Sequence, residues 1–359
     1  MQTDWTSLQS KTIDALRFPM AVAVVMLHYG KTVIVDASGP TRWLCILFQE
    51  GICRLAVPCF FFISGFLFFN KLQEWSWSEW GRKMKGRART LLLPYILWCI
   101  IALLVFWAYQ NLHDGPVSLL QKFRDYGGIR MFWSVPGGLP LGSQAYPVDG
   151  PLWFIRDLMY FILATPLIYL FLRWTKVYGI LGLCVLFLAV RRVVPEGFLF
   201  FVLGAYMQLG RKNIMETVWP RRYALLAAAL VFLAATCLLL DVSEYWSRFC
   251  KFFFLVSGIG ASFCLAAWNW EKQEQLSQPF LARSSFFIFA AHEILILQFV
   301  ARPLVAAILP MQTAWGGIIA FFLIPALAVA ICLALLFVMQ KVLPRTTGIL
   351  TGNRQIQTA

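Results

Sequence analysis

Two ionisable side chains, Arg17 and His28, stand eleven residues apart at the ends of an almost wholly apolar run. On an α-helix this spacing returns to within roughly 20° of the same face and rises about 16 Å. Arginine binds anions and histidine exchanges protons near neutral pH. Ionisable groups deep in a bilayer are costly and usually face a bundle interior or an aqueous cavity. The first helix is therefore predicted to line a polar cavity.

The rest of the chain must supply the other walls of that cavity. Its 359 residues are 60% hydrophobic and 13% charged, with a mean hydropathy of +0.70, which is too apolar for a water-soluble protein of this length. We predict an all-α polytopic membrane protein with a single transmembrane domain over residues 1–359. The ten expected spans are residues 13–34, 45–69, 90–110, 151–172, 177–190, 195–210, 222–240, 249–270, 284–301 and 314–341.

The net charge of +14 raises the question of a nucleic-acid partner. With the N-terminus in the cytoplasm, ten spans return the C-terminus there, and the segments between spans that hold most Lys and Arg residues are then cytoplasmic. This distribution follows the positive-inside rule, so the charge predicts a membrane orientation and no nucleic acid. Three arginines, Arg17, Arg54 and Arg156, remain inside spans.

Residues 82–89 contain five cations directly before the third span: Arg82, Lys83, Lys85, Arg87 and Arg89. One interpretation is a topology determinant that also touches anionic lipid. The other is a landing surface for a phosphate-bearing cytosolic substrate, because Arg and Lys bind phosphates strongly. The sequence leaves both open.

Residues 111–150 form the one long loop, placed outside and rich in glycine and proline. Its aromatic residues favour a folded cover, and aromatic faces of this kind can stack on a sugar ring: Tyr126, Phe132, Trp133 and Tyr146.

Further polar residues lie in or beside apolar spans. Arg156 and Asp157 lie near the outer interface, where an arginine can snorkel to water. His292 and Glu293 interrupt the ninth span, either as a buried structural histidine or as part of a polar cavity shared with His28. Ser64, followed by a glycine, allows close helix approach or local unwinding.

These residues resemble the membrane-bound acyltransferase 3 family, bacterial proteins that O-acylate surface glycans and related molecules. The likeness begins with IDAL at residues 13–16 and the Arg17 to His28 spacing. It continues through FFFISGF at residues 60–66, the basic segment that ends in LPY at residues 93–95, GPLWFI at residues 150–155, and His292. It covers essentially the whole chain.

The resemblance implies transfer of an acyl group, with acetyl as the expected group, from a coenzyme A thioester to a hydroxyl of a cell-surface glycan or a lipid-linked sugar. It also implies a bacterial inner-membrane location and no metal. Arg17, Arg87 and Arg89 would hold the phosphates, and His28 would act as general base or accept the acyl group itself. Glu293 is the best candidate to orient His28. The residues expected to support the site are Asp14, Arg54, Ser64, Trp153, Arg156, His292 and Glu293.

Two other classes of function remain open from the sequence. In a transporter or flippase, Arg17, Arg54 and His28 would line a path for an anionic or lipid-linked solute, and broken helices at the midplane would be expected. A membrane scaffold would not need the polar stripe on the first span.

Overall fold

The computed structural model describes residues 4–30, 39–70, 75–132, 147–190, 193–272 and 279–352, and all regular structure in these ranges is helical. The predicted all-α membrane bundle is confirmed. The α-helices are α1 (Trp5–Gly30), α2 (Gly39–Ile46), α3 (Ala56–Phe69), α4 (Trp77–Arg87), α5 (Leu93–His113), α6 (Leu119–Asp125), α7 (Trp153–Leu163), α8 (Thr165–Ala189), α9 (Glu196–Leu209), α10 (Ile214–Val218), α11 (Arg222–Leu239), α12 (Glu244–Lys272), α13 (Pro279–Ala291), α14 (Arg302–Ile308), α15 (Ala314–Val342) and α16 (Pro344–Leu350).

Seven helical segments in the described residues are long and apolar enough to cross a membrane, or eight if a bent pair that begins at Pro279 counts as one span. This is fewer than the ten predicted. The eleven residues of α7 and the fourteen of α9 rise only about 16 and 21 Å, less than the hydrocarbon core of about 30 Å. The predicted span 151–172 is divided because Pro166 lies in the first turn of α8, where proline starts a helix more easily than it continues one.

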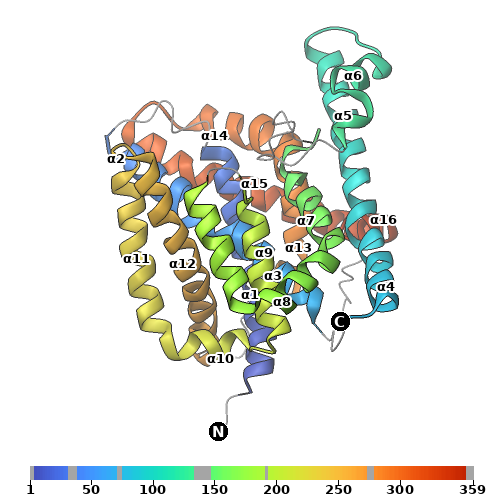
Figure 1. Ribbon diagram of the computed structural model, residues 1–359. Helices are drawn as coiled ribbons and strands as arrows, with labels where there is room; N and C mark the ends of the chain where they lie inside the picture. Colours follow the sequence, from blue (N-terminus) through green and yellow to red (C-terminus); the bar gives the residue numbers. More distant parts are fainter. Residues whose placement is uncertain are drawn as a thin grey trace.

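Helix α1 lies in the middle of the bundle and packs against α3, α12, α13 and α15 (Figure 1). The helix that carries Arg17 and His28 therefore has protein on several sides. Helix α5 stands at the edge of the bundle and carries α6 at its far end (Figure 1). The C-terminal helix α16 packs on α5, where the indole nitrogen of Trp98 donates to the Leu350 carbonyl at 3.0 Å.

Helices α3 and α9 approach each other through two glycines. A Cβ atom added to Gly65 would lie 2.0 Å from the carbonyl oxygen of Phe201, and one added to Gly204 would lie 2.0 Å from that of Phe62. Small residues let membrane helices pack backbone to backbone. The Ser64-Gly65 pair thus serves close approach, one of the two roles predicted for it, and places Ser64 beside the cavity described below.

This contact predicts a large effect of a single methyl group. Gly65→Ala forces the α3 and α9 backbones apart, and overpacking of this kind costs about 1–3 kcal/mol. We expect a lower apparent Tm for the purified protein in detergent. Gly182→Ala on α8 is the matched control, because a Cβ there meets nothing within 4 Å. Equal Tm values for the two variants would contradict the proposed packing role.

Two of the π-helical segments in the described residues lie near candidate arginine and histidine ligands of the site. A π-helix spans His292–Ala301 after α13, within a pair of helices bent by 62°. Another spans Ala88–Leu92, between α4 and α5. Such wide turns are frequent at functional sites.

The predicted outer loop is partly helical, since α5 continues to His113 and α6 follows. Residues 133–146, which include Trp133 and Tyr146, lie outside the described residues, so the predicted cover over a sugar stays a prediction. The two flanks of this stretch meet, because the Val148 backbone N–H donates to the Met131 carbonyl at 3.2 Å.

Candidate active site

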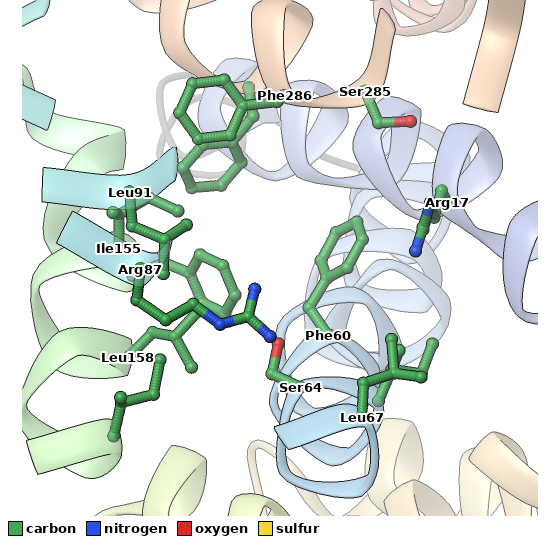
Figure 2. Close-up of a pocket in the computed structure, with 14 residues that line it drawn as sticks. Arg17, Phe60, Ser64, Leu67, Arg87, Leu91, Ile155, Leu158, Ser285 and Phe286 are labelled. Atoms are coloured by element: carbon green, nitrogen blue, oxygen red, sulfur yellow. The ribbon is translucent and has the colours of Figure 1, made fainter. Parts of the chain in front are cut away.

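A cavity of about 300 Å³ lies between α1, α3, α4, α7 and α13. Figure 2 shows the guanidinium of Arg87 pointing across it toward Ser64, with Arg17 on the other side of Phe60. Polar groups thus come from α1, α3 and α4, and Ser285 adds one from α13. The remaining lining is apolar: Phe60, Ile63, Leu67, Leu91, Phe154, Ile155, Leu158, Ile162, Phe286 and Phe289. Two cations in an otherwise apolar cavity suit a ligand with an anionic end and a long uncharged arm.

The five cations of residues 82–89 do not all face the cavity. Arg87 lines the cavity, whereas Arg89 is exposed and does not. Two residues along a helix correspond to a rotation of about 200°, so the two arginines face nearly opposite sides. Lys83 donates to the Phe68 carbonyl at the end of α3, and Arg82 pairs with Glu79. The structure therefore brings together Arg17 and Arg87 of the three predicted phosphate ligands.

His28 is paired with a carboxylate. Its Nδ1 atom lies 2.7 Å from Oε2 of Glu293, in the π-helix that follows α13. The two side chains are close enough to pair, and the orienting role expected of Glu293 stays a prediction. A carboxylate that accepts a hydrogen bond from Nδ1 would fix the tautomer and leave Nε2 available to accept a proton. At the other end of the stripe, the expected pair of Arg17 with Asp14 forms at 2.9 Å.

His292 is completely buried next to His28. The two rings meet edge to face with centroids 5.0 Å apart. Nδ1 of His292 lies 2.9 Å from the Ile288 carbonyl oxygen and 3.0 Å from that of Phe289, so it carries the proton. His292 is therefore a buried, hydrogen-bonded histidine, which is the first of the two roles predicted for it. It also contacts His28.

One residue of the cavity lining lies near the histidine pair. This is Phe289, whose ring centroid is 6.5 Å from that of His292, and His292 contacts His28, although neither histidine lines the cavity. Arg17 lies near the middle of α1 and His28 near its C-terminal end, about 16 Å apart along the helix.

His28, His292 and Glu293 also have atoms that could ligate a metal, all within 4.8 Å of one another. Ligands at about 2.0–2.2 Å in a tetrahedral zinc site are separated by about 3.3 Å. The 2.7 Å contact between His28 and Glu293 is shorter than this. Their spacing suits a direct hydrogen bond better than a shared ion.

Arg54 does not reach this site. Its guanidinium lies 2.8 Å from Oε1 of Glu50, and Lys251 lies 2.6 Å from Oε2 of the same carboxylate. This cluster compensates the charge of Arg54. The prediction that Arg54 supports the site or lines a path with Arg17 therefore finds no support in the geometry.

The interpretation of Arg156 as a snorkelling residue is wrong. Its side chain is only 2% exposed, and its Nε and Nη2 atoms both lie 2.9 Å from Oδ1 of Asp157. Because α7 packs inside the bundle, the arginine is neutralised by its neighbour in sequence instead of by water. Trp153, at the start of α7, does not line the cavity and packs against Phe61, with ring centroids 6.5 Å apart. Neither residue lines the cavity, and the supporting role expected of both stays a prediction.

Asp149 is a buried group that the sequence analysis did not single out. It is 1% exposed and directly precedes the short helix Gly150–Leu152. Burial, followed by the charge of Glu293, raises the pKa of this carboxyl well above its usual range. The available signal was an acid immediately before the GPLWFI motif, but only the fold places it beside Glu293.

An all-helical membrane bundle with a cationic cavity and a carboxylate-paired histidine is compatible with a membrane-embedded catalyst of group transfer. Residues 10–337 match the model of the acyltransferase domain family, and the chain belongs to this family. The predicted family membership is confirmed. No solved structure matches the chain significantly.

The chain is similar to the succinoglycan biosynthesis protein ExoH of Rhizobium meliloti (strain 1021). The two are 27% identical over 365 residues, which cover 96% of this chain and 92% of the relative.

Proposed function

We propose that this protein transfers an acyl group, most simply acetyl, from a coenzyme A thioester to a hydroxyl of a cell-surface glycan or lipid-linked sugar in the bacterial inner membrane. The family membership supports acyl transfer, and the name of the relative supports a glycan acceptor. The observation that carries the proposal is the cavity lined by Arg17 and Arg87, one wall of which, Phe289, lies near the histidine that contacts the His28–Glu293 pair.

In the proposed orientation of the donor, its phosphates would lie at the two arginines of the cavity. Arg17 and Arg87 would form charge-assisted hydrogen bonds with the phosphates. The cavity, at about 300 Å³, is at the small end of ligand sites and would hold the pantetheine arm, leaving the nucleotide at its mouth. Ser64 and Ser285 offer hydroxyls to the amides of that arm. The thioester would then lie toward Phe289 and the histidines.

His28 would supply the proton chemistry. Nε2 takes the proton of the acceptor hydroxyl, the hydroxyl oxygen attacks the thioester carbonyl, the C–S bond breaks, and the proton passes to the leaving thiolate. Glu293 stabilises the imidazolium formed in between. In the second route, His28 attacks the thioester and then passes the acyl group to the hydroxyl. Neither route requires a metal.

A binding experiment tests the donor. Purified protein in lipid nanodiscs is titrated with acetyl coenzyme A, and we expect the apparent Tm to rise with concentration because a ligand stabilises the state that it binds. Incubation with radiolabelled acetyl coenzyme A and membrane glycans should then transfer the label. Transbilayer movement of an unmodified solute without transfer of label would instead favour the transporter.

Two neighbouring arginines provide a matched test of the donor site. Arg87→Lys should raise KM for the acyl donor about tenfold, because lysine offers a point charge in place of the planar guanidinium fork. Arg89→Lys, on the exposed side, should leave KM near the wild-type value. Both variants keep the number of positive charges, so membrane orientation is preserved. Equal effects of the two substitutions would mean that the segment acts only through its total charge.

A further inference from the structure

Asp149 is an isolated acid in a buried position. Its side chain is 1% exposed, and among the described residues neither carboxyl oxygen has a hydrogen-bond donor. An ionised carboxylate without donors is very costly in such surroundings, and a buried acid usually keeps its proton instead. The groups that face Asp149 are Cys99 of α5 and Glu293 of the π-helix.

Glu293 lies against Gly150, the residue that follows Asp149. A Cβ atom added to Gly150 would lie 3.2 Å from Oε2 of Glu293, so the carboxylate occupies space beside this glycine that a side chain would crowd. The same oxygen lies 2.7 Å from Nδ1 of His28, and the charge of Glu293 acts on Asp149. Two carboxyl groups that share a site cannot both ionise easily, so one proton remains on the pair.

The surroundings decide which acid holds that proton. Glu293 has His28 as a partner, and its side chain is 35% exposed. Asp149 has neither a cationic partner nor contact with solvent. We propose that Asp149 is a positioning residue that stays a neutral carboxylic acid and donates its proton in a hydrogen bond to Glu293, which holds that carboxylate against Nδ1 of His28.

This arrangement controls the charge next to the base. With Asp149 neutral, the cluster of His28, His292, Glu293 and Asp149 has one negative charge, enough to stabilise the imidazolium formed during transfer. A second negative charge would hold a proton on His28 in the resting enzyme and remove the base. The inference thus rests on the proposed role of His28. Asp149 keeps its own proton throughout, and the proton of the hydroxyl still passes by His28 to the thiolate.

Two substitutions separate the neutral acid from a carboxylate. Asn has nearly the same shape as the protonated acid, and its amide group can donate to Glu293, so Asp149→Asn should keep at least about a third of kcat. Asp149→Ala removes the donor to a charged group and should lower kcat about 10- to 100-fold. Asp114→Asn at the exposed end of α5 is the control. If kcat of the Asp149→Asn variant falls as far as kcat of the Asp149→Ala variant, Asp149 works as a carboxylate and the proposal is wrong.

The pH profile gives a second readout. Wild-type activity should fall at alkaline pH as Asp149 ionises beside Glu293, because a raised pKa means that the neutral form persists through neutral pH and is lost above it. Asp149→Asn has no proton to lose there, so this alkaline decline should disappear. An identical decline in both proteins would overturn the assignment.

An infrared measurement needs no substrate. At neutral pH, the wild-type minus Asp149→Asn difference spectrum should contain the carbonyl band of a protonated carboxylic acid, and its absence would refute the neutral acid. Because this readout does not depend on catalysis, it tests the protonation of Asp149 separately from the proposed role of His28. A band together with full activity of His28→Ala would remove His28 from the mechanism and leave the protonation of Asp149 intact. The Asn variant alone supports this test if the Ala variant does not fold.

Discussion

His28→Ala is expected to lower kcat for acyl transfer by about 10²- to 10⁴-fold, the usual contribution of a general base. This corresponds to about 2.7–5.4 kcal/mol of transition-state stabilisation. The side chain touches Glu293 and His292, and its removal leaves an apolar helix that should still insert into the membrane. Initial rates with labelled acetyl coenzyme A, at equal amounts of membrane-inserted protein, measure the effect.

The third histidine of the chain supplies the control. His113 lies at the exposed end of α5, stacked on Tyr109 with ring centroids 4.2 Å apart, far along the chain from the cavity residues. His113→Ala should retain wild-type rates. Full activity of His28→Ala would remove His28 from the mechanism.

The same variants distinguish the two routes of transfer. If His28 accepts the acyl group, wild-type protein given labelled donor without acceptor should become labelled and release free coenzyme A, and His28→Ala should not. If His28 is only a base, no label should stay on the protein in the absence of acceptor.

Substitution of Arg17 should mainly weaken donor binding. Arg17→Ala is expected to raise KM for acetyl coenzyme A about 10- to 100-fold, the effect of losing hydrogen bonds to a charged group. Arg17→Lys should fall between the alanine variant and wild type, because it keeps the charge and loses the planar fork that matches a phosphate. Steady-state kinetics with the donor varied at saturating acceptor separate KM from kcat.

Lys85→Ala provides the comparison for Arg17, since Lys85 is an exposed cation in the same basic region and does not line the cavity. Its KM for the donor should stay near wild type. If Arg17→Lys matches wild type as well, Arg17 serves as an interfacial anchor, and the donor phosphates must be bound elsewhere.

The sequence by itself determined the class of protein. Apolar runs of span length require helices in a bilayer, because only helices and closed barrels satisfy every backbone polar group there. The helical period placed Arg17 and His28 on one stripe, and three residues of spacing paired Asp14 with Arg17. The motifs identified the family, which the match over residues 10–337 confirmed. All of these features depend on local spacing or on composition.

The tertiary structure decided which distant polar groups meet. The sequence could not choose between Arg87 and Arg89, and only the rotation of α4 against the bundle turns Arg87 inward. Arg54 found Glu50 and Lys251 instead of the cavity, and Arg156 was buried with Asp157. Glu293 lies against Gly150, next to the buried Asp149, because the glycine has no side chain to crowd the carboxylate. Such pairings depend on how helices far apart in the sequence rotate and pack. An unpaired charge is costly in an apolar bundle, and any oppositely charged partner that the fold brings within reach can neutralise it.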